Sequence, residues 1–330
     1  MSLPIEERVS ASGAAGQDGD PPVLADPDGQ FARNFNRRHF RFTHGLKGHP
    51  LFELANLIAL AKRPLHVEAY WSNGKVGPAD SWGSNPAPRL SLVDTLANIG
   101  DNNSLVILKQ IAHDPVHGPV LQDFLARVAS LLGEQICQDV VAGETTILIS
   151  SPNRLTSYHM DPGCNFLMQV AGNKTLWVYD HTDPTLVSHE EIEQFYMGNH
   201  NSIVYRESRQ CDAAAYELHA GDGVHIPFFA PHWARNHDNI SIALSVYYEL
   251  RPMLAEKRIY QLNGLLRKLG ATPTPPGISP SRDRLKLAAA NGVVAAYRLI
   301  RRKRAHPVWT PRLASQRHGK RAPVDRSIAR

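Results

Sequence analysis

The sequence predicts a mainly β core with flanking helices. Seven or eight short apolar segments between residues 145 and 248 are separated by Gly and Pro, which is typical of a closed or sandwiched all-β unit. Helical spacing of apolar residues is found before and after these segments. With 330 residues, 42% of them hydrophobic, the chain is long for a single barrel, so helices around the strands are expected.

The N-terminal part of the chain is predicted to brace the barrel. Residues 1–30, rich in Gly, Ala, Asp and Pro, are predicted to be disordered, and residues 31–135 to form a mainly helical segment. Within it, residues 51–61 carry one apolar stripe, Ser91 begins a capping box, and residues 119–132 repeat apolar side chains at helical spacing. Residues 104–109 are predicted to form a strand. Residues 71–88 read as a loop, either purely structural or holding substrate contacts.

The predicted catalytic core spans residues 136–250. A helix at about residues 189–196 is expected to interrupt its strands. The strands are predicted at residues 145–150, 157–161, 165–171, 175–179, 216–219, 224–226 and 240–248.

The C-terminal part is predicted to be helical and then basic. Residues 251–304 show two apolar helical faces, which suit either a homodimer or packing onto the barrel. From Arg282 to the end, the sequence has 14 Lys and Arg against two Asp, whereas the net charge of the whole chain is only +5. The part of the chain before Arg282 therefore carries a net negative charge. Residues 301–304 and the basic tail at 305–330 either contact nucleic acid, ribosome or an anionic membrane surface, or stay solvated.

Several classes of protein are excluded by composition. No uninterrupted apolar run reaches 18 residues, and the first seven residues lack the form of a signal peptide, so no transmembrane segment is expected. Cys137, Cys164 and Cys211 are widely spaced and indicate neither a disulfide framework nor a zinc site. A cytoplasmic location is therefore predicted.

A metal-ligand pair stands out at His159 and Asp161. Two residues apart on a strand, they would leave the same face and hold one ion. The 16 His and 18 Asp of the chain make roughly one His-x-Asp triplet expected by chance, so the triplet alone carries little weight. A second triplet, His181 to Asp183, is closed by Pro184 and is predicted to be a turn.

The third ligand is expected on a later strand that returns beside the first. His232 follows a Gly-Asp-Gly turn, a short apolar strand and a Pro-rich bend, and is the predicted distal ligand. His219, His225 and His237 are rivals, and His225 alternates with apolar neighbours that could place it in the cavity. A 2-His-1-carboxylate set suits non-haem Fe(II) that activates oxygen.

These residues resemble the cupin-like (JmjC-type) 2-oxoglutarate and Fe(II) oxygenases, and among them the asparaginyl hydroxylases that modify a hypoxia-inducible transcription factor. The likeness covers about residues 140–250. It rests on order and spacing: Thr three before the first His, His-x-Asp, Asn four after the Asp, an apolar strand ending in Gly-x-Lys, and a His five after Ile-Pro. The matching positions are Thr156, His159, Asp161, Asn165, Lys174, Pro227 and His232.

The resemblance implies a double-stranded β-helix (jelly-roll) core and a set of roles. Fe(II) would be held by the two His and Asp161, and Lys174 with Thr156 would bind the far carboxylate of 2-oxoglutarate. Asn165 would lie near this cosubstrate. Ser245 stands where the compared hydroxylases have asparagine. This difference weakens the assignment of Ser245 to the cosubstrate site, because its shorter side chain would reach the cosubstrate only through water. The family's dimerisation through C-terminal helices would favour a homodimer here.

The implied reaction uses O2 to hydroxylate a C–H bond of a protein side chain or small molecule, releasing succinate and CO2. Demethylation is chemically available to the same site. Two alternatives stay open at this point: a metal cupin enzyme that does not use 2-oxoglutarate, and a non-catalytic module that uses the barrel as a ligand cup.

Overall fold

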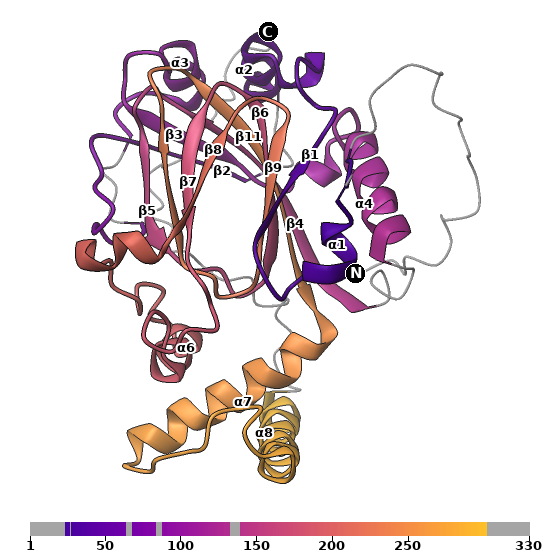
Figure 1. Ribbon diagram of the computed structural model, residues 1–330, viewed down its shortest axis with the longest axis vertical. Helices are drawn as coiled ribbons and strands as arrows, with labels where there is room; N and C mark the ends of the chain where they lie inside the picture. Colours follow the sequence, from indigo (N-terminus) through magenta and orange to yellow (C-terminus); the bar gives the residue numbers. More distant parts are fainter. Residues whose placement is uncertain (1–23, 27, 64–67, 84–87, 133–138, 302–330) are drawn as a thin grey trace, which may run out of the picture.

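The computed structural model describes residues 24–26, 28–63, 68–83, 88–132 and 139–301. Two facing antiparallel sheets form its centre (Figure 1). The larger sheet has the strand order β1-β9-β6-β11-β4-β3-β2, and the smaller one β5-β10-β7-β8. The strands of the larger sheet are β1 (Phe40–Thr43), β2 (Ala69–Asn73), β3 (Ser104–Leu108), β4 (Val140–Ser150), β6 (Cys164–Ala171), β9 (Asp222–Ile226) and β11 (Ser241–Leu250). The smaller sheet contains β5 (Leu155–His159), β7 (Lys174–Val178), β8 (Ala214–Leu218) and β10 (His232–Asn236).

Three apolar layers hold the sheets in place. The innermost lies between the sheets and includes Leu167 on β6 and Leu176 on β7. The second covers the outer face of the larger sheet, where Phe166 and Ile149 pack against helices from the N-terminal part. Those helices are α1 (Gln30–Asn34), α2 (Leu54–Lys62), α3 (Leu92–Ala97) and α4 (Gly118–Leu132), with short 3-10 turns η2 (Pro50–Phe52) and η3 (Ile111–His113).

The third apolar layer covers the outer face of the smaller sheet. Trp177 and Trp233 stack there at 3.9 Å between ring centroids, and Tyr260 from the C-terminal helices joins the same cluster. The elements on this side are α6 (His189–Tyr196), η4 (Glu207–Asp212) and α7 (Arg251–Lys268). Because side chains alternate along each strand, these outer layers leave the other face of both sheets to line the interior.

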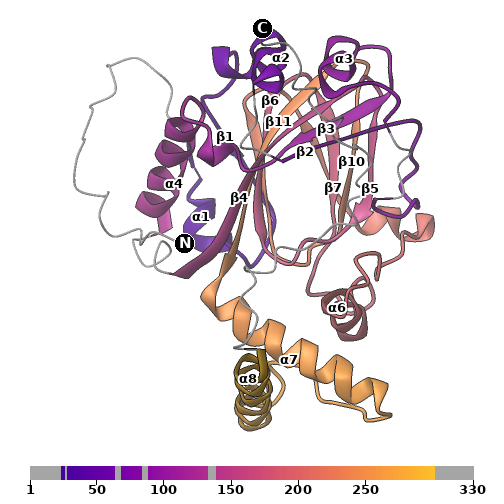
Figure 2. The same cartoon turned by 180° about the vertical axis from the view of Figure 1, so that it is seen from behind.

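The C-terminal helices α7 and α8 (Pro280–Arg301) lie at one end of the β unit, opposite α2 and α3 (Figures 1 and 2). In the described residues, no helix is both long and apolar enough to cross a membrane. The predicted basic tail at 305–330 lies outside the described residues, as do residues 302–304.

The predicted fold class is confirmed: the core is a jelly-roll, or double-stranded β-helix, of antiparallel strands with flanking helices. The predicted helices at residues 119–132 and 189–196 are also present, within one residue. Ser91 caps α3, because its hydroxyl accepts from the Asp94 amide at 3.1 Å.

Some element predictions were wrong. Trp71 lies in β2, so the predicted loop at 71–88 begins too early. The segment 31–135 contributes β1 and β2 to the larger sheet, which were not predicted, whereas the strand predicted at 104–109 is present as β3. Part of the N-terminal segment is also structured: Leu24 is fully buried and Ala25 pairs with Thr43. The prediction of disorder for residues 1–23 lies outside the described residues.

Candidate metal centre

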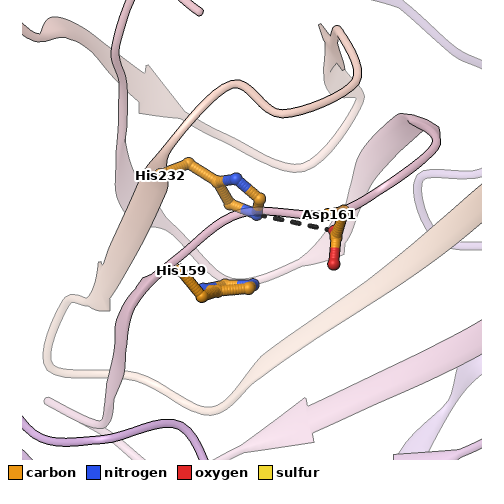
Figure 3. Close-up of side chains that lie close together, drawn as sticks. All are labelled: His159, Asp161 and His232. Atoms are coloured by element: carbon orange, nitrogen blue, oxygen red, sulfur yellow. Dashed lines mark ion pairs between the residues drawn. The ribbon is translucent and has the colours of Figure 1, made fainter. Parts of the chain in front are cut away.

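Two imidazoles and one carboxylate converge on the inner face of the smaller sheet. The ligand atoms of His159, Asp161 and His232 all lie within 4.8 Å of one another, and Figure 3 shows the three side chains pointing together. The two ring centroids are 4.2 Å apart. His232 Nε2 and Asp161 Oδ2 are 3.9 Å apart, too far for a hydrogen bond. The three groups thus face one another without being bonded.

An extra residue in β5 sets which side chains face inward. His159 pairs with His232, and Thr156 pairs with Ala234, so three steps along β5 match two along β10. This is a β-bulge, in which two residues of one strand oppose one of its partner. Thr156 and His159 therefore share the inner face, and Tyr158 joins the outer cluster.

Backbone carbonyls fix the tautomer of both histidines. His159 Nδ1 lies 2.7 Å from the Ser157 carbonyl, and His232 Nδ1 lies 2.9 Å from the Ala230 carbonyl. A carbonyl only accepts, so each Nδ1 carries a proton, and in the neutral ring Nε2 then keeps the lone pair. Burial lowers the pKa of His232 to about 4, which keeps that ring neutral at physiological pH. Imidazoles held through Nδ1 in this way are suited to bind a metal through Nε2.

Asp161 reaches the site from a turn. The predicted strand at 157–161 ends at His159, so the expected strand alternation of His159 and Asp161 was wrong in its detail. The carbonyl of Asp161 accepts a 2.8 Å hydrogen bond from the amide of Phe229. Phe229 has a φ of 57°, a left-handed conformation that costs a non-glycine residue of the order of 1 kcal/mol. This bond ties the Asp161 turn to the loop that leads into His232.

Lys174 begins β7 on the same inner face. It pairs with Asn236, which lies four residues along β10 from His232, roughly 13 Å at the usual rise per residue. Lys174 is 5% exposed, and burial lowers its pKa to about 8. Within the described residues, burial alone lowers this pKa, with no charged or hydrogen-bonding group offsetting it. A buried cation without a partner is unstable unless an anion binds it.

The other predicted cosubstrate residues lie between these two ends. Asn165 and Ser245 are both 8% exposed, and Ser245 donates to Asn165 Oδ1 at 2.9 Å. Asn165 pairs with Ile226, and Ser245 with Leu167, both apolar residues of the interior layer. Thr156 faces the same interior from β5. All seven predicted site residues are thus directed at one interior.

The rival histidines lie elsewhere. His225 is fully buried on the outer face of β9, stacked against Phe35 at 5.1 Å and in tilted contact with Phe166 at 4.6 Å between ring centroids. His219 contacts Asp222, and His237 contacts Glu217. The alternation along β9 suggested that His225 could face the interior. This was wrong, because Val224 and Ile226 face the interior and His225 faces outward.

The second His-x-Asp triplet is a turn, as predicted. Asp183 accepts from the amide and hydroxyl of Thr185 and pairs with Arg209 at 3.4 Å. Its carboxylate is occupied by these local contacts, so it does not form a metal site.

One residue beside the centre was missed as an individual. The indole of Trp82 stacks on the His159 imidazole, with centroids 4.6 Å apart and planes 13° from parallel. The sequence indicated only that the surrounding loop could hold substrate contacts. The signal for Trp82 is a tertiary contact that no local pattern encodes.

Residues 94–253 match the family model described as the cupin-like domain. No curated protein matches the sequence. The crystal structure of the ribosomal oxygenase YcfD from Escherichia coli is 16% identical, covering 82% of this chain and 67% of that chain with a TM-score of 0.47. YcfD in complex with cobalt and 2-oxoglutarate is also 16% identical, covering 80% and 65%, with a TM-score of 0.45. A mutant of the Bacillus subtilis oxalate decarboxylase OxdC is 11% identical over 44% and 26%, with a TM-score of 0.26.

The family match covers all seven predicted site residues and most strands of the jelly-roll core. Residues 94–253 of this chain are therefore a match to the cupin-like domain, with a two-His, one-carboxylate group on its inner face.

Proposed function

We propose that this protein is an Fe(II)- and 2-oxoglutarate-dependent oxygenase that hydroxylates a C–H bond of a protein side chain or small molecule. The observation that carries the proposal is Lys174, a buried ammonium on the same inner face as the three metal-binding side chains. A dicarboxylate that reaches from an ion at His232 toward Lys174 would neutralise this charge. Among common cosubstrates of such sites, 2-oxoglutarate has the required second carboxylate.

The donor set fits ferrous iron. Two imidazoles and one carboxylate leave coordination positions open, as non-haem Fe(II) oxygenases require. Asp161 is the more exposed of the pair, with 32% of its side chain accessible against 8% for His232. With Fe(II), 2-oxoglutarate and O2 bound, the centre supplies the oxidation of an unactivated C–H bond, with succinate and CO2 as coproducts.

The chain's own residues bind, orient and exclude water. Lys174 would pair with the far carboxylate, and the Thr156 hydroxyl would donate to the same group. Asn165 has its carbonyl oxygen occupied by Ser245, so its amide N–H groups are the donors left for a ligand. The apolar interior of Leu176, Val178 and neighbouring residues keeps water from the charge pair, which strengthens it.

The substrate is proposed at class level. A protein side chain and a small molecule would both fit this chemistry. Two alternatives remain distinct: a metal cupin enzyme that does not use 2-oxoglutarate, and a non-catalytic ligand-binding module. Free thiols at Cys164 and Cys211 support a reducing, cytoplasmic setting, where iron stays ferrous.

An anaerobic titration tests this proposal. Purified protein with Fe(II) is expected to develop a weak visible charge-transfer band on addition of 2-oxoglutarate, and to form succinate in air. K174E should abolish the band, whereas K62M, at an exposed lysine of α2, should leave it unchanged. No band and no succinate from iron-loaded wild-type protein would disprove the proposal. Activity that survives in K174E would favour a 2-oxoglutarate-independent enzyme, and a biological role that survives in D161A would favour a binding module.

We also propose that the protein forms a homodimer through its C-terminal helices. Leu265, Leu269, Ile278 and Leu285 on or between α7 and α8 are 47–85% exposed. Large apolar side chains gathered on one helix pair favour burial against a second copy.

A further inference from the structure

Trp82 forms a flat contact with a proposed metal ligand. Its half-buried indole lies over the His159 imidazole with a centroid distance of 4.6 Å and an interplanar angle of 13°. His159 is itself partly exposed, and in the part of the chain that the structure describes its ring hydrogen-bonds through Nδ1 to the Ser157 carbonyl alone. Such a bond leaves the ring free to tilt unless a neighbour packs against its face.

The loop that carries Trp82 is fastened at two points. The Asn201 side chain accepts from the Trp82 amide at 2.6 Å and donates to the Trp82 carbonyl at 3.2 Å. A few residues earlier, the Pro78 carbonyl accepts from the amide of Tyr158 at 3.0 Å, at the bulge of β5. Asn201 thus binds both backbone groups of one exposed-loop residue, an arrangement that fixes the direction of its side chain.

The energetic balance favours a positioning role. An aromatic pair in this geometry attracts beyond the area it buries. The two hydrogen bonds to Asn201 together restrict the loop more than either does alone. Groups that orient a metal ligand typically change metal affinity by about 10–100-fold when removed.

We propose that Trp82 is a positioning residue of the metal centre, which holds the His159 imidazole in the plane that directs Nε2 to the ion, and that Asn201 is the clamp that holds Trp82. The inference rests on the proposed function only in requiring that the three side chains bind a divalent metal. It goes beyond that function by assigning the 77–83 loop to the centre itself, in addition to any substrate contact.

Titration with Co(II), which gives visible d–d bands where Fe(II) does not, tests the assignment without turnover. W82A is expected to weaken Co(II) binding by about 10–100-fold and to shift the d–d bands, because one imidazole is then less well oriented. W82F keeps an aromatic face and should bind within about threefold of wild type. N201A should weaken binding in the same direction as W82A, by about 3–10-fold.

N56A is the matched control, since Asn56 also binds a backbone carbonyl through its side chain but lies on α2, away from the centre. It should bind Co(II) like the wild type. If W82A does not fold, N201A still decides, because it removes no aromatic ring. Wild-type affinity and unshifted bands in folded W82A or N201A would overturn the role of Trp82 and leave the metal site standing. Failure of the wild type itself to bind Co(II) would overturn both proposals.

Discussion

Ser245 donates its hydroxyl to Asn165 Oδ1 at 2.9 Å, across the adjacent strands β11 and β6. The bond settles the orientation of the Asn165 amide, because its oxygen is used by the protein and its nitrogen is left to donate. Ser245 thereby contacts the interior through Asn165.

Loss of Asn165 should weaken 2-oxoglutarate binding more than loss of Ser245. N165A removes a donor and is expected to raise the KM for 2-oxoglutarate about tenfold, whereas S245A removes only its support and should raise it about threefold. The double variant should resemble N165A, since both act through one amide. Steady-state kinetics with varied 2-oxoglutarate measures this. Additive effects would contradict the linkage.

Lys174 should cost stability in the absence of ligand. Its folded pKa of about 8 lies below the ordinary value of about 10.4, so between these values the unfolded chain binds more protons and the free energy of unfolding rises with pH. Below pH 8 the full penalty is present. K174M should therefore raise the free energy of unfolding at pH 7 by about 1–3 kcal/mol while abolishing 2-oxoglutarate binding. Urea unfolding of the metal-free protein measures it. A destabilised K174M would show that the ammonium already has a partner.

The affinity for 2-oxoglutarate should fall in alkaline solution. Under the proposed function the carboxylate would bind the ammonium form of Lys174, which predominates below pH 8 and is lost above it. The dissociation constant of 2-oxoglutarate should be flat from pH 6.5 to 7.5 and then rise by about tenfold per pH unit. Isothermal titration of the Co(II)-loaded protein measures this. K174R, whose guanidinium stays charged, should bind more weakly but show no such rise.

Metal binding should depend on His159, Asp161 and His232, and on no other histidine that the structure describes. H159A, D161A and H232A should each lose at least about tenfold in Co(II) affinity, because two ligands hold the ion less well than three. H237A changes an exposed histidine that contacts Glu217, and should bind metal normally. H225A should destabilise the fold by opening a cavity among Phe35, Phe40 and Phe166, without changing the metal stoichiometry. Metal content by mass spectrometry after dialysis checks each variant.

The oligomeric state should depend on the C-terminal helices. L269E with L285E places charges at two of the most exposed apolar positions and should shift a dimer to monomer in light scattering. The control V204E changes a 64% exposed valine outside α7 and α8 and should not. A monomeric wild type at micromolar concentration would remove the proposal.

The fold class was predictable because alternation and Gly-Pro punctuation are local. No strand range was predicted for β1, β2 or β10, although His232 was expected on a strand that returns beside the first ligand. These strands are short and mix polar with aromatic residues, as in His232-Trp-Ala-Arg-Asn. They form because neighbouring strands pair with them: β9, β3 and β7 supply their hydrogen bonds. Such pairing is a property of the assembled sheet and leaves little trace in four or five residues.

The parts of the candidate site that depend on residue spacing along the chain could be predicted from the sequence. The parts that depend on tertiary contacts could not. His159, Asp161 and His232 were assigned from order along the chain, and they converge. The inward phase at His225 and the stack of Trp82 on His159 depend on which side of a strand faces which layer. Neither is encoded within a few residues of the side chain concerned.

Because of the bulge in β5, the metal centre depends on the number of residues between Thr156 and His159. Thr156 and His159 face the same interior only because the strand holds one residue more than its partner between them. Ser157 contributes to the centre through its backbone carbonyl. The presence of a residue at this position therefore matters more to the centre than which side chain it carries. Deleting one residue at 157 or 158 would turn either Thr156 or His159 outward. At this point the chain should therefore tolerate substitution far better than a change in length.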